Sequence, residues 1–280
     1  MTKFACITLD MEPDHGDPEK RIRLFENPEY IERYISIINK HGAKVTMFTV
    51  TSLFEKFGAD FTKLAANIPL EYAIHSHSHD PYHACSLEEV ESSSEAYRKF
   101  TGIAPTGYRA PIGRIDKDGL GHLLDKGFMY DASVYTSVRP GEFGYSNLHM
   151  PNVPFRIVRR NDALVEFPFT ALSTIRIVFA LSYVKLLGWG VYSSLLKIFG
   201  LPDSTLLLSH PHDFYFHLVA KGSHGLEKFA LSRNATRAFD YFDKLISVLK
   251  ARGYQFLFMS ELYQQVKDSD LQEFKWDEWK

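Results

Sequence analysis

The 280-residue sequence has few cysteines and no dense block of basic residues. Its two cysteines are Cys6, in an apolar run, and Cys85. So few thiols argue against a disulfide framework and suit a reducing compartment. The formal net charge is -2, with acids and bases mixed along the chain. Because nucleic-acid binding needs many phosphate contacts from basic residues, we expect no nucleic-acid partner.

Long apolar runs are also missing. The most apolar stretch, Ile175 to Phe199, is interrupted by Arg176, Lys185 and Lys197, which argues against a membrane span. The stretch predicts a core helix or a dimer contact. The alternative is an apolar rim beside the active site, which could receive a lipid carrier. The chain enters a strand-like run at Phe4 without the apolar core of a signal peptide, which predicts a cytoplasmic protein.

Strand-like and helical patterns alternate along the chain. Strand-like runs occupy residues 4–9, 43–50, 70–74, 164–167, 205–208 and 254–258. Helical patterns occupy residues 29–40, 86–100, 116–126 and 237–251, and the second opens with Ser86-Leu87-Glu88-Glu89, which has the Ser-x-x-Glu form of a capping box. This order predicts one α/β domain over residues 1–280, with a parallel sheet and an active site at the carboxyl ends of its strands. The Pro- and Gly-containing stretch 137–161 is predicted to be a functional loop or an excursion rather than a domain boundary.

The strongest chemical signal is a run of alternating histidines, His75-Ser76-His77-Ser78-His79, directly after a strand-like run. In an extended chain the three imidazoles share a face, whereas in a helical turn only His75 and His79 do. Either geometry lets two imidazoles meet one cation, which favours a metal site over a solvated polar loop. In the helical geometry His77 would point away and make a supporting or surface contact.

Two acidic side chains converge at the end of the first strand-like run. A period of two puts Asp10 and Glu12 on the same side, and Pro13 stops the strand. One carboxylate can complete a metal shell with two imidazoles, while the other takes a proton from water in the open position. A charged turn with a helix cap is the alternative.

These segments and three later ones resemble, in order, the motifs of the polysaccharide deacetylases, the NodB-homology or carbohydrate esterase family 4 (CE4) group. The histidine run matches the family's His-Ser/Thr-x-x-His motif. The later segments are Arg109-Ala110-Pro111-Ile112-Gly113, Gly127-Phe128-Met129-Tyr130-Asp131-Ala132-Ser133 and Leu206-Leu207-Leu208-Ser209-His210. The motifs span about residues 4–258. The first motif departs from the common pattern of adjacent aspartates and resembles a variant Asp-x-Glu branch, which includes relatives acting on cyclic ureides and imides.

The resemblance implies a distorted (β/α) barrel and a metal-dependent hydrolase that removes the acetyl group from an N-acetylated sugar. It implies His75 and His79 as ligands of one divalent cation. We favour Glu12 as the third ligand because it shares a face with Asp10, and Asp14 is the alternative. Zinc is the first expectation, although cobalt, nickel, iron and manganese also occupy such shells.

The resemblance also assigns the catalytic roles. Asp10 would be the general base, and Arg109 would hold it ionised. His210 would be the general acid, with His212 as its rival. Asp131 would tune the acid histidine. A guanidinium lowers the pKa of a neighbouring carboxyl and a carboxylate raises that of an imidazole, so base and acid would hold complementary protonation states.

The substrate side is expected around three further residues. Leu208 would line a pocket for the acetyl methyl, and Tyr108 and Pro111 would contact the substrate beside Arg109. The partner would be an N-acetylated saccharide, free or lipid-linked, and a homo-oligomer is compatible with the sequence. A cyclic amide or ureide hydrolase and a non-catalytic carbohydrate-binding relative are the alternative functions.

Overall fold

The computed structural model of the chain describes residues 2–15, 17, 19–215 and 225–279. The main sheet runs, in spatial order, through β10 (Ser204–Ser209), β1 (Lys3–Met11), β2 (Val45–Thr49), β3 (Leu70–Ile74), β4 (Gly107–Tyr108), β5 (Tyr130–Asp131), β9 (Asp162–Glu166), β8 (Phe155–Arg159) and β12 (Gln272–Lys275). Strand β11 (Tyr254–Phe256) also pairs with β1.

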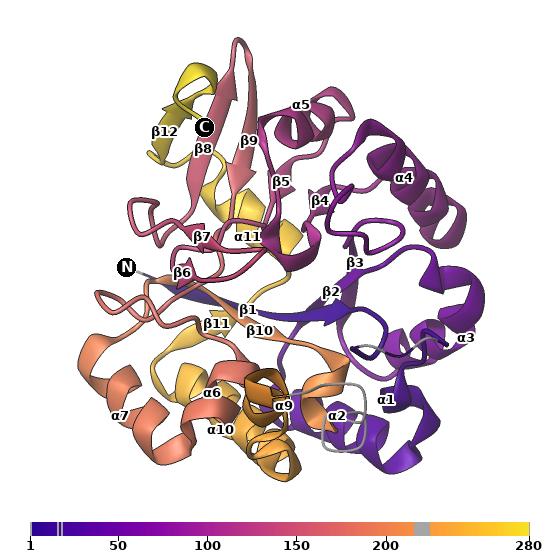
Figure 1. Cartoon of the computed structure of the whole chain (residues 1–280), viewed down its shortest axis with the longest axis vertical. Coiled ribbons are helices and arrows are strands. Elements are labelled where there is room, and N and C mark those ends of the chain that lie inside the picture. The colour runs from indigo at the N-terminus through magenta and orange to yellow at the C-terminus, as the bar shows by residue number, and fades with distance from the viewer. Residues whose placement is uncertain (1, 16, 18, 216–224, 280) are drawn as a thin grey trace.

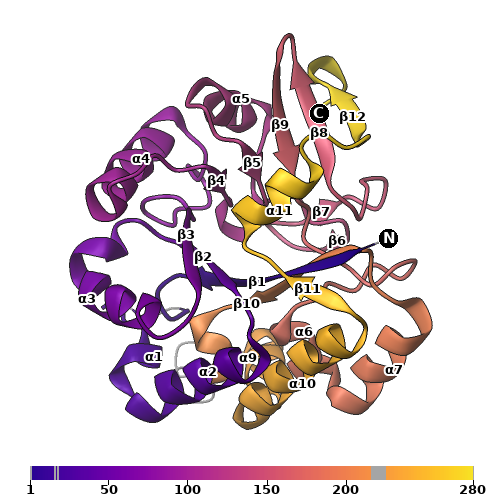
Figure 2. The same ribbon diagram turned by 180° about the vertical axis from the view of Figure 1, so that it is seen from behind.

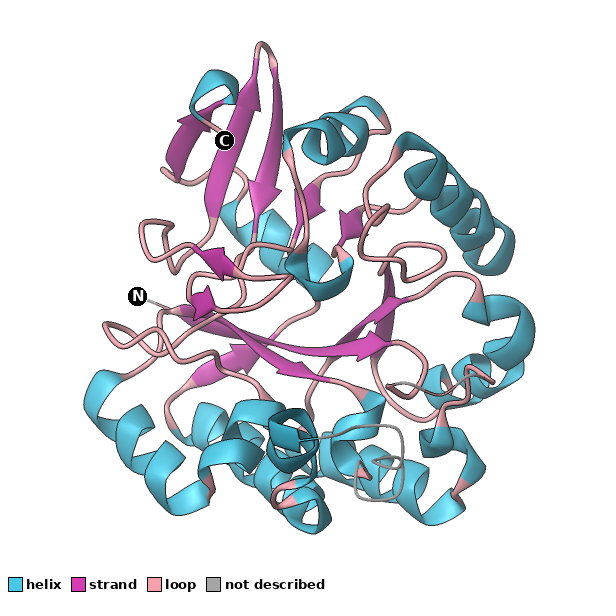
Figure 3. Ribbon diagram, in the orientation of Figure 1, coloured by secondary structure: helices cyan, strands magenta, loops and turns pink. Residues whose placement is uncertain are grey.

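Helices flank most of this sheet (Figures 1 and 2). Figure 3 shows β1 and β10 near the centre and most helices at the periphery, while β8, β9 and β12 reach the upper edge. The described helices are α1 (Arg23–Glu26), α2 (Pro28–His41), α3 (Leu53–Ala65), α4 (Leu87–Thr101), α5 (Lys117–Asp125), α6 (Leu181–Leu187), α7 (Trp189–Phe199), α9 (Gly225–Ser232), α10 (Ala238–Ala251) and α11 (Met259–Val266). Short 3-10 turns include η1 (Pro111–Gly113), η2 (Pro211–Phe214), η4 (Ala235–Arg237) and η5 (Trp276–Glu278).

The predicted α/β fold of the deacetylase type is confirmed as a curved, mainly parallel sheet. Within the main sheet only the β8–β9 pair is antiparallel among the described strands. Among the described residues, the pairing of strands does not close the sheet into a complete barrel. Isolated bridges, Ala171 with Val178 and Ala180 with Leu208, instead span the distance between the segment after β9 and strand β10. The barrel is therefore distorted on this side.

The residues of β1 alternate between two environments. Those facing the outer helices are apolar and join the large core cluster: Ala5, Ile7, Leu9 and Met11. Cys6 belongs to a second cluster with Met259 and Leu262 of α11, which fills the inner side of the curved sheet. The period of two then directs Thr8 and Asp10 to the same inner side as Cys6. One end of the sheet's inner face is thus filled by an apolar cluster, and the other end carries polar side chains.

The stretch 137–161, predicted to be a functional loop or an excursion, carries short strands. It contains the hairpin of β6 (Val138–Arg139) and β7 (Tyr145–Ser146), followed by β8. Pro140 and Gly141 lie in the hairpin turn, and Pro154 directly precedes β8. The turn residues therefore mark the boundaries of short strands rather than one long loop.

Within the apolar stretch Ile175 to Phe199, helix α6 begins at Leu181 and α7 ends at Phe199. No helix in the described part of the chain is long and apolar enough to cross a membrane. Trp189 packs against α10, with its ring centroid 6.3 Å from that of Tyr241. Tyr183 of α6, in contrast, packs on an apolar cluster that contains Leu208. Only the beginning of the stretch therefore approaches the predicted site.

Candidate functional site

Neighbouring strand ends bring the predicted site residues together. Asp10 lies at the end of β1, with Glu12 directly beyond it, and His75 follows β3. Arg109 follows β4 and His210 follows β10. Because these strands are parallel, their carboxyl ends lie at one edge of the sheet.

Glu12, His75 and His79 form a cluster whose ligand atoms lie within 4.8 Å of one another. Oε2 of Glu12 lies 2.6 Å from Nε2 of His79 and 3.6 Å from Nε2 of His75. Nε2 of His75 is buried and has no hydrogen-bond partner among the described residues. Two donors about 2.1 Å from a tetrahedral zinc ion are about 3.4 Å apart, so the cluster fits such a cation.

The backbone fixes the ring of His75. Its Nδ1 lies 2.8 Å from the carbonyl oxygen of Arg109, so Nδ1 carries the proton and donates it. In the neutral ring the lone pair then lies on Nε2, the atom that faces Glu12. This is the tautomer that a metal ligand needs.

Glu89 of α4 stabilises the turn that carries His79 by hydrogen bonds to its backbone. Its Oε1 accepts hydrogen bonds from the backbone N–H groups of His77 at 2.8 Å and Ser78 at 2.5 Å. Ser86 caps α4 by accepting from the N–H of Glu89 at 3.3 Å. The predicted capping box is therefore only half formed, because the Glu89 carboxylate binds the histidine turn instead of returning to Ser86.

Glu12 and His79 stabilise each other's charged forms. Burial alone would raise the pKa of Glu12, but the neighbouring His79 and His75 outweigh it and hold this pKa well below its usual range. Burial alone would lower the pKa of His79, but Glu12 outweighs it and raises this pKa. In the absence of a cation this pair is ionised, and a divalent cation would replace the proton on His79.

Arg109 fixes Asp10. The guanidinium is fully buried between two rings, with Cζ 3.9 Å from the centroid of Phe48 and 4.6 Å from that of Phe169. One terminal nitrogen donates to Oδ1 of Asp10 at 2.5 Å and to the hydroxyl of Thr8 at 3.1 Å. With Oδ1 held, Oδ2 of Asp10 lies 4.0 Å from Nε2 of His75 and 3.9 Å from Nε2 of His210.

The structure corrects the predicted partner of His210. Asp131 accepts hydrogen bonds from the hydroxyl and the N–H of Ser133, at 2.7 and 3.2 Å. The carboxylate beside the imidazole is that of Asp213, whose Oδ2 lies 3.2 Å from Nδ1 of His210 and accepts its backbone N–H at 3.0 Å. The reason is local, because η2 turns the chain and returns the third residue after His210 to it.

His210 and His212 lie parallel, with ring centroids 5.1 Å apart, but their environments differ. Burial would lower the pKa of His210, but its hydrogen bond to Asp213 and the charges of Glu12, Asp213 and Asp10 raise it to about 9. For His212, burial and then the charge on His210 lower the pKa to about 4. At neutral pH His210 is therefore the protonated ring and His212 the neutral one.

Asp14, the alternative third ligand, faces another direction. Its Oδ2 accepts hydrogen bonds from the guanidinium and backbone N–H of Arg23, at 3.0 and 3.2 Å. Its Oδ1 accepts from the hydroxyl of Tyr215 at 2.5 Å. These contacts engage both oxygens of Asp14 and leave Glu12 as the carboxylate beside the histidines.

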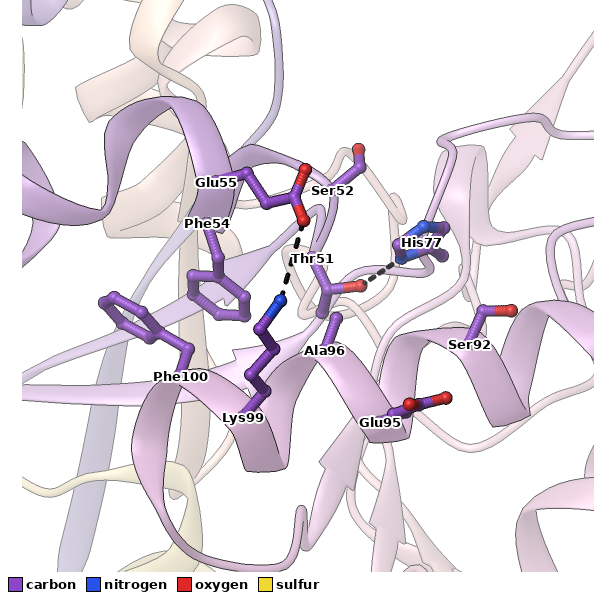
Figure 4. Close-up of a pocket in the computed structure, with 10 residues that line it drawn as sticks. All are labelled: Thr51, Ser52, Phe54, Glu55, His77, Ser92, Glu95, Ala96, Lys99 and Phe100. Carbon is purple, nitrogen blue, oxygen red and sulfur yellow. Dashed lines mark hydrogen bonds and ion pairs between the residues drawn. The ribbon is translucent and has the colours of Figure 1, made fainter.

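His77 lies on the far side of the histidine turn from Glu12. Its Nδ1 is 2.9 Å from the hydroxyl of Thr51 (Figure 4), and it lines a groove of about 660 Å³ that α3 and α4 border. Phe54 and Phe100 stack in this groove with centroids 4.2 Å apart. His77 is thus separate from the cluster of Glu12, His75 and His79.

The three predicted substrate contacts have different surroundings. Leu208 is buried in a small apolar cluster with Phe169 and Val178. Pro111 is buried at the start of η1, and its contact with substrate stays a prediction. Tyr108 is fully buried, and its hydroxyl donates to the carbonyl oxygen of Ala84. Tyr108 therefore belongs to the core, and its predicted contact with substrate is wrong.

Sequence reasoning missed two residues that hold the site. Asp213 lies three residues after His210, a spacing that a capping turn brings back to its first residue, and this was its available signal. Glu89 was read only as half of a capping box. Its actual contact with the histidine turn depends on how α4 packs, which the local pattern does not contain.

Comparison with known proteins agrees with these motifs. Residues 2–130 match the family model described as polysaccharide deacetylase. The peptidoglycan deacetylase-like protein FGM2 of Gibberella zeae is 31% identical over 113 residues, which cover 37% of this chain and 32% of that protein. The matched part therefore spans about a third of the relative's length.

Solved structures share the fold. A Mycobacterium smegmatis protein assigned as a polysaccharide deacetylase has a TM-score of 0.61 and 15% identity, covering 98% of this chain and 93% of that one. A CE4 family pseudoenzyme from Bacillus anthracis has a TM-score of 0.52 and 14% identity, covering 98% and 69%. Identities this low show the fold alone, and activity has to be argued from the site.

The family match covers Asp10, Glu12, the histidine run and Arg109, whereas His210 lies beyond it and joins the site through the fold. The Asp-x-Glu branch stays a prediction. The resemblance to the polysaccharide deacetylases that the motifs predicted is therefore confirmed, in sequence over residues 2–130 and in fold over nearly the whole chain.

Proposed function

We propose that this chain is a metal-dependent deacetylase that hydrolyses the acetamide of an N-acetylated saccharide. The observation that carries the proposal is the arrangement of Asp10, whose Oδ2 lies about equally far from Nε2 of His75 and Nε2 of His210. Glu12, His75 and His79 would hold one divalent cation, zinc first. When bound, the cation would polarise the acyl oxygen and make a water molecule more acidic.

The protein's own residues divide the proton transfers between them. Oδ2 of Asp10 accepts the proton of the attacking water, while Arg109 holds Oδ1 and orients the carboxylate. Nε2 of His210 donates a proton to the departing nitrogen, since an amine leaves far more readily once protonated.

His210 is better suited than His212 to act as the acid. A pKa raised to about 9 keeps His210 protonated at neutral pH, whereas a pKa lowered to about 4 leaves His212 without the proton to donate. A cation at Glu12 would offset part of the negative charge that raises the pKa of His210 and bring it closer to neutral pH.

The apolar cluster around Leu208 suits a small methyl group. Leu208 lies at the end of β10, two residues before His210, and packs with Phe169 and Tyr183. An acetyl methyl would lie against this surface while its carbonyl carbon faces Asp10. The same cluster offers no charged partner for a larger acyl group's polar end, which favours acetyl over such groups.

The proposal is tested by acetate release from N-acetylglucosamine oligomers, with hydantoin as the cyclic ureide control. Chelation should abolish acetate release and zinc should restore it, because the cation supplies the polarisation that the residues lack. Asp10→Asn should lower the rate by at least about 100-fold while the metal stays bound. Equal rates in chelated and zinc-loaded protein would contradict the proposal.

Hydantoin opening without acetate release would favour the cyclic ureide alternative that the Asp-x-Glu motif raises. Absence of both reactions in zinc-loaded protein would favour a non-catalytic relative, as in the pseudoenzyme that shares the fold.

A further inference from the structure

One lysine is buried beside the proposed acid. Lys185 of α6 and its partner Asp213 are each only 1% exposed at the side chain, and Nζ lies 3.1 Å from Oδ1 of Asp213. Among the described residues Asp213 is the one hydrogen-bond acceptor of this ammonium group. A buried ammonium is costly unless it is paired, so Lys185 and Asp213 depend on each other.

The two oxygens of Asp213 have separate partners. Oδ1 accepts from Lys185, whereas Oδ2 accepts from the backbone N–H of His210 and contacts its Nδ1. A carboxylate held at both oxygens cannot rotate about its last bond. Nδ1 of His210 is therefore held on one side while Nε2 faces Asp10 on the other.

The fold itself does not require a lysine at this position. Leu181 and Val184 of the same helix are buried with Lys185, and the neighbouring Leu186 and Leu187 are apolar. Replacing a buried ion pair by apolar residues of similar volume is often neutral or stabilising. The amide of Asn234 donates to the carbonyl oxygen of Lys185 at 2.7 Å and fixes the helix end that carries it.

We propose that Lys185 is a positioning residue, which holds Oδ1 of Asp213 so that Oδ2 orients the ring of His210 towards Asp10. The inference rests on the proposed role of His210 as the acid. None of the sequence motifs includes Lys185, which lies on a helix between the last two motif segments, and only the fold brings it to the site.

The test is Lys185→Met, which keeps the length of the side chain and removes its charge. We expect kcat on N-acetylglucosamine oligomers to fall about 10- to 100-fold, with KM and zinc content unchanged, because orienting partners of reacting groups have effects of this size. Lys197→Met, an exposed lysine of α7, is the matched control and should leave kcat unchanged.

A double-mutant cycle separates positioning from general destabilisation. In the His210→Ala background, Lys185→Met should cause no further loss of kcat, because the ring it orients is absent. An equal loss in both backgrounds would overturn the proposal. If Lys185→Met does not fold, the double variant Lys185→Met/Asp213→Asn removes both charges. Its kcat should match that of Asp213→Asn alone. A further loss of kcat in the double variant would contradict the proposal.

A second readout does not depend on activity and so separates this inference from the proposed function. In metal-free protein labelled with 15N-histidine, the ring nitrogen resonances of His210 are identified by their loss in His210→Ala. Lys185→Met should shift them and leave those of His122, on α5, in place. Unmoved His210 resonances would overturn the positioning role even if acetate is released. Shifted resonances without acetate release would uphold it and contradict only the proposed function.

Discussion

Two buried carboxyl groups, Asp131 and Glu166, lie side by side at the ends of β5 and β9. Oε1 of Glu166 accepts the backbone N–H of Val134 at 2.8 Å. Burial, and then the neighbouring Asp131, raise the pKa of Glu166 well above its usual value of 4.5. The pair therefore favours holding one shared proton in the fold, since ionising both adjacent carboxyl groups is costly in a buried place.

This shared proton predicts a pH dependence of stability. Above its usual pKa of 4.5 the carboxyl of Glu166 is ionised in the unfolded chain, but it keeps its proton in the fold. Folding therefore takes up a proton, and the contribution of Glu166 is fully present below pH 4.5 and is lost as pH rises towards the folded pKa. Glu166→Gln keeps a neutral donor at this position and should remove this loss.

The measurement is urea unfolding of chelated protein between about pH 5 and 8, the range in which linkage to Glu166 should lower the free energy of unfolding. Glu166→Gln should give a flatter pH profile than wild type, while the exposed control Glu32→Gln should follow wild type. Identical profiles for Glu166→Gln and wild type would show that no proton is shared.

Among the elements, the two-residue strand β4 depends on a glycine. A Cβ atom on Gly107 would lie 2.0 Å from Cζ of Tyr130, a buried residue of the neighbouring strand whose ring packs edge-on against Phe167. The strands can approach to their observed register only if this position has no side chain. Arg109, two residues further on, depends on that register.

Gly107→Ala should therefore destabilise the protein by about 1–3 kcal/mol or more, the usual cost of overpacking a core. Gly190→Ala is the control, because nothing lies within 4 Å of a Cβ there and the position is inside α7. It should be neutral or stabilising by up to about 1 kcal/mol, since alanine favours helix. Chemical denaturation measures both, and equal stability of the two variants would contradict this account of β4.

Local sequence patterns predicted the helices and strands better than they predicted which side chains contact one another. The run 70–74 coincides with β3, and 205–208 lies within β10, because alternation and β-branched residues report a buried strand directly. Helix α3 was missed although Phe54, Phe57 and Phe61 repeat at helical spacing and are buried. In the site, the motifs predicted the side chains that meet, but the carboxylate beside His210 is that of Asp213 and not the predicted Asp131, because the choice depends on how a turn folds back.

On the scale of the whole molecule, the two ends of the inner face of one curved sheet differ: one end is packed with apolar residues and the other carries the site residues. Helix α11 and apolar residues such as Cys6 and Leu206 fill one end of its inner face. The other end gathers Asp10, with Arg109 and the histidine cluster, from strands distant in sequence. Burial at this end strengthens every charge–charge interaction, so a divalent cation would be held by few but well-oriented ligands.

The most direct test of this account is the zinc content of the dialysed protein and its variants. We predict about one zinc per chain in wild type and in Asp10→Asn, because the base is not a ligand. His75→Ala, His79→Ala and Glu12→Gln should each lose most of the bound zinc, and the first two should also release no acetate. Full occupancy in both histidine variants would contradict the assignment of the metal site and, with it, the proposed mechanism.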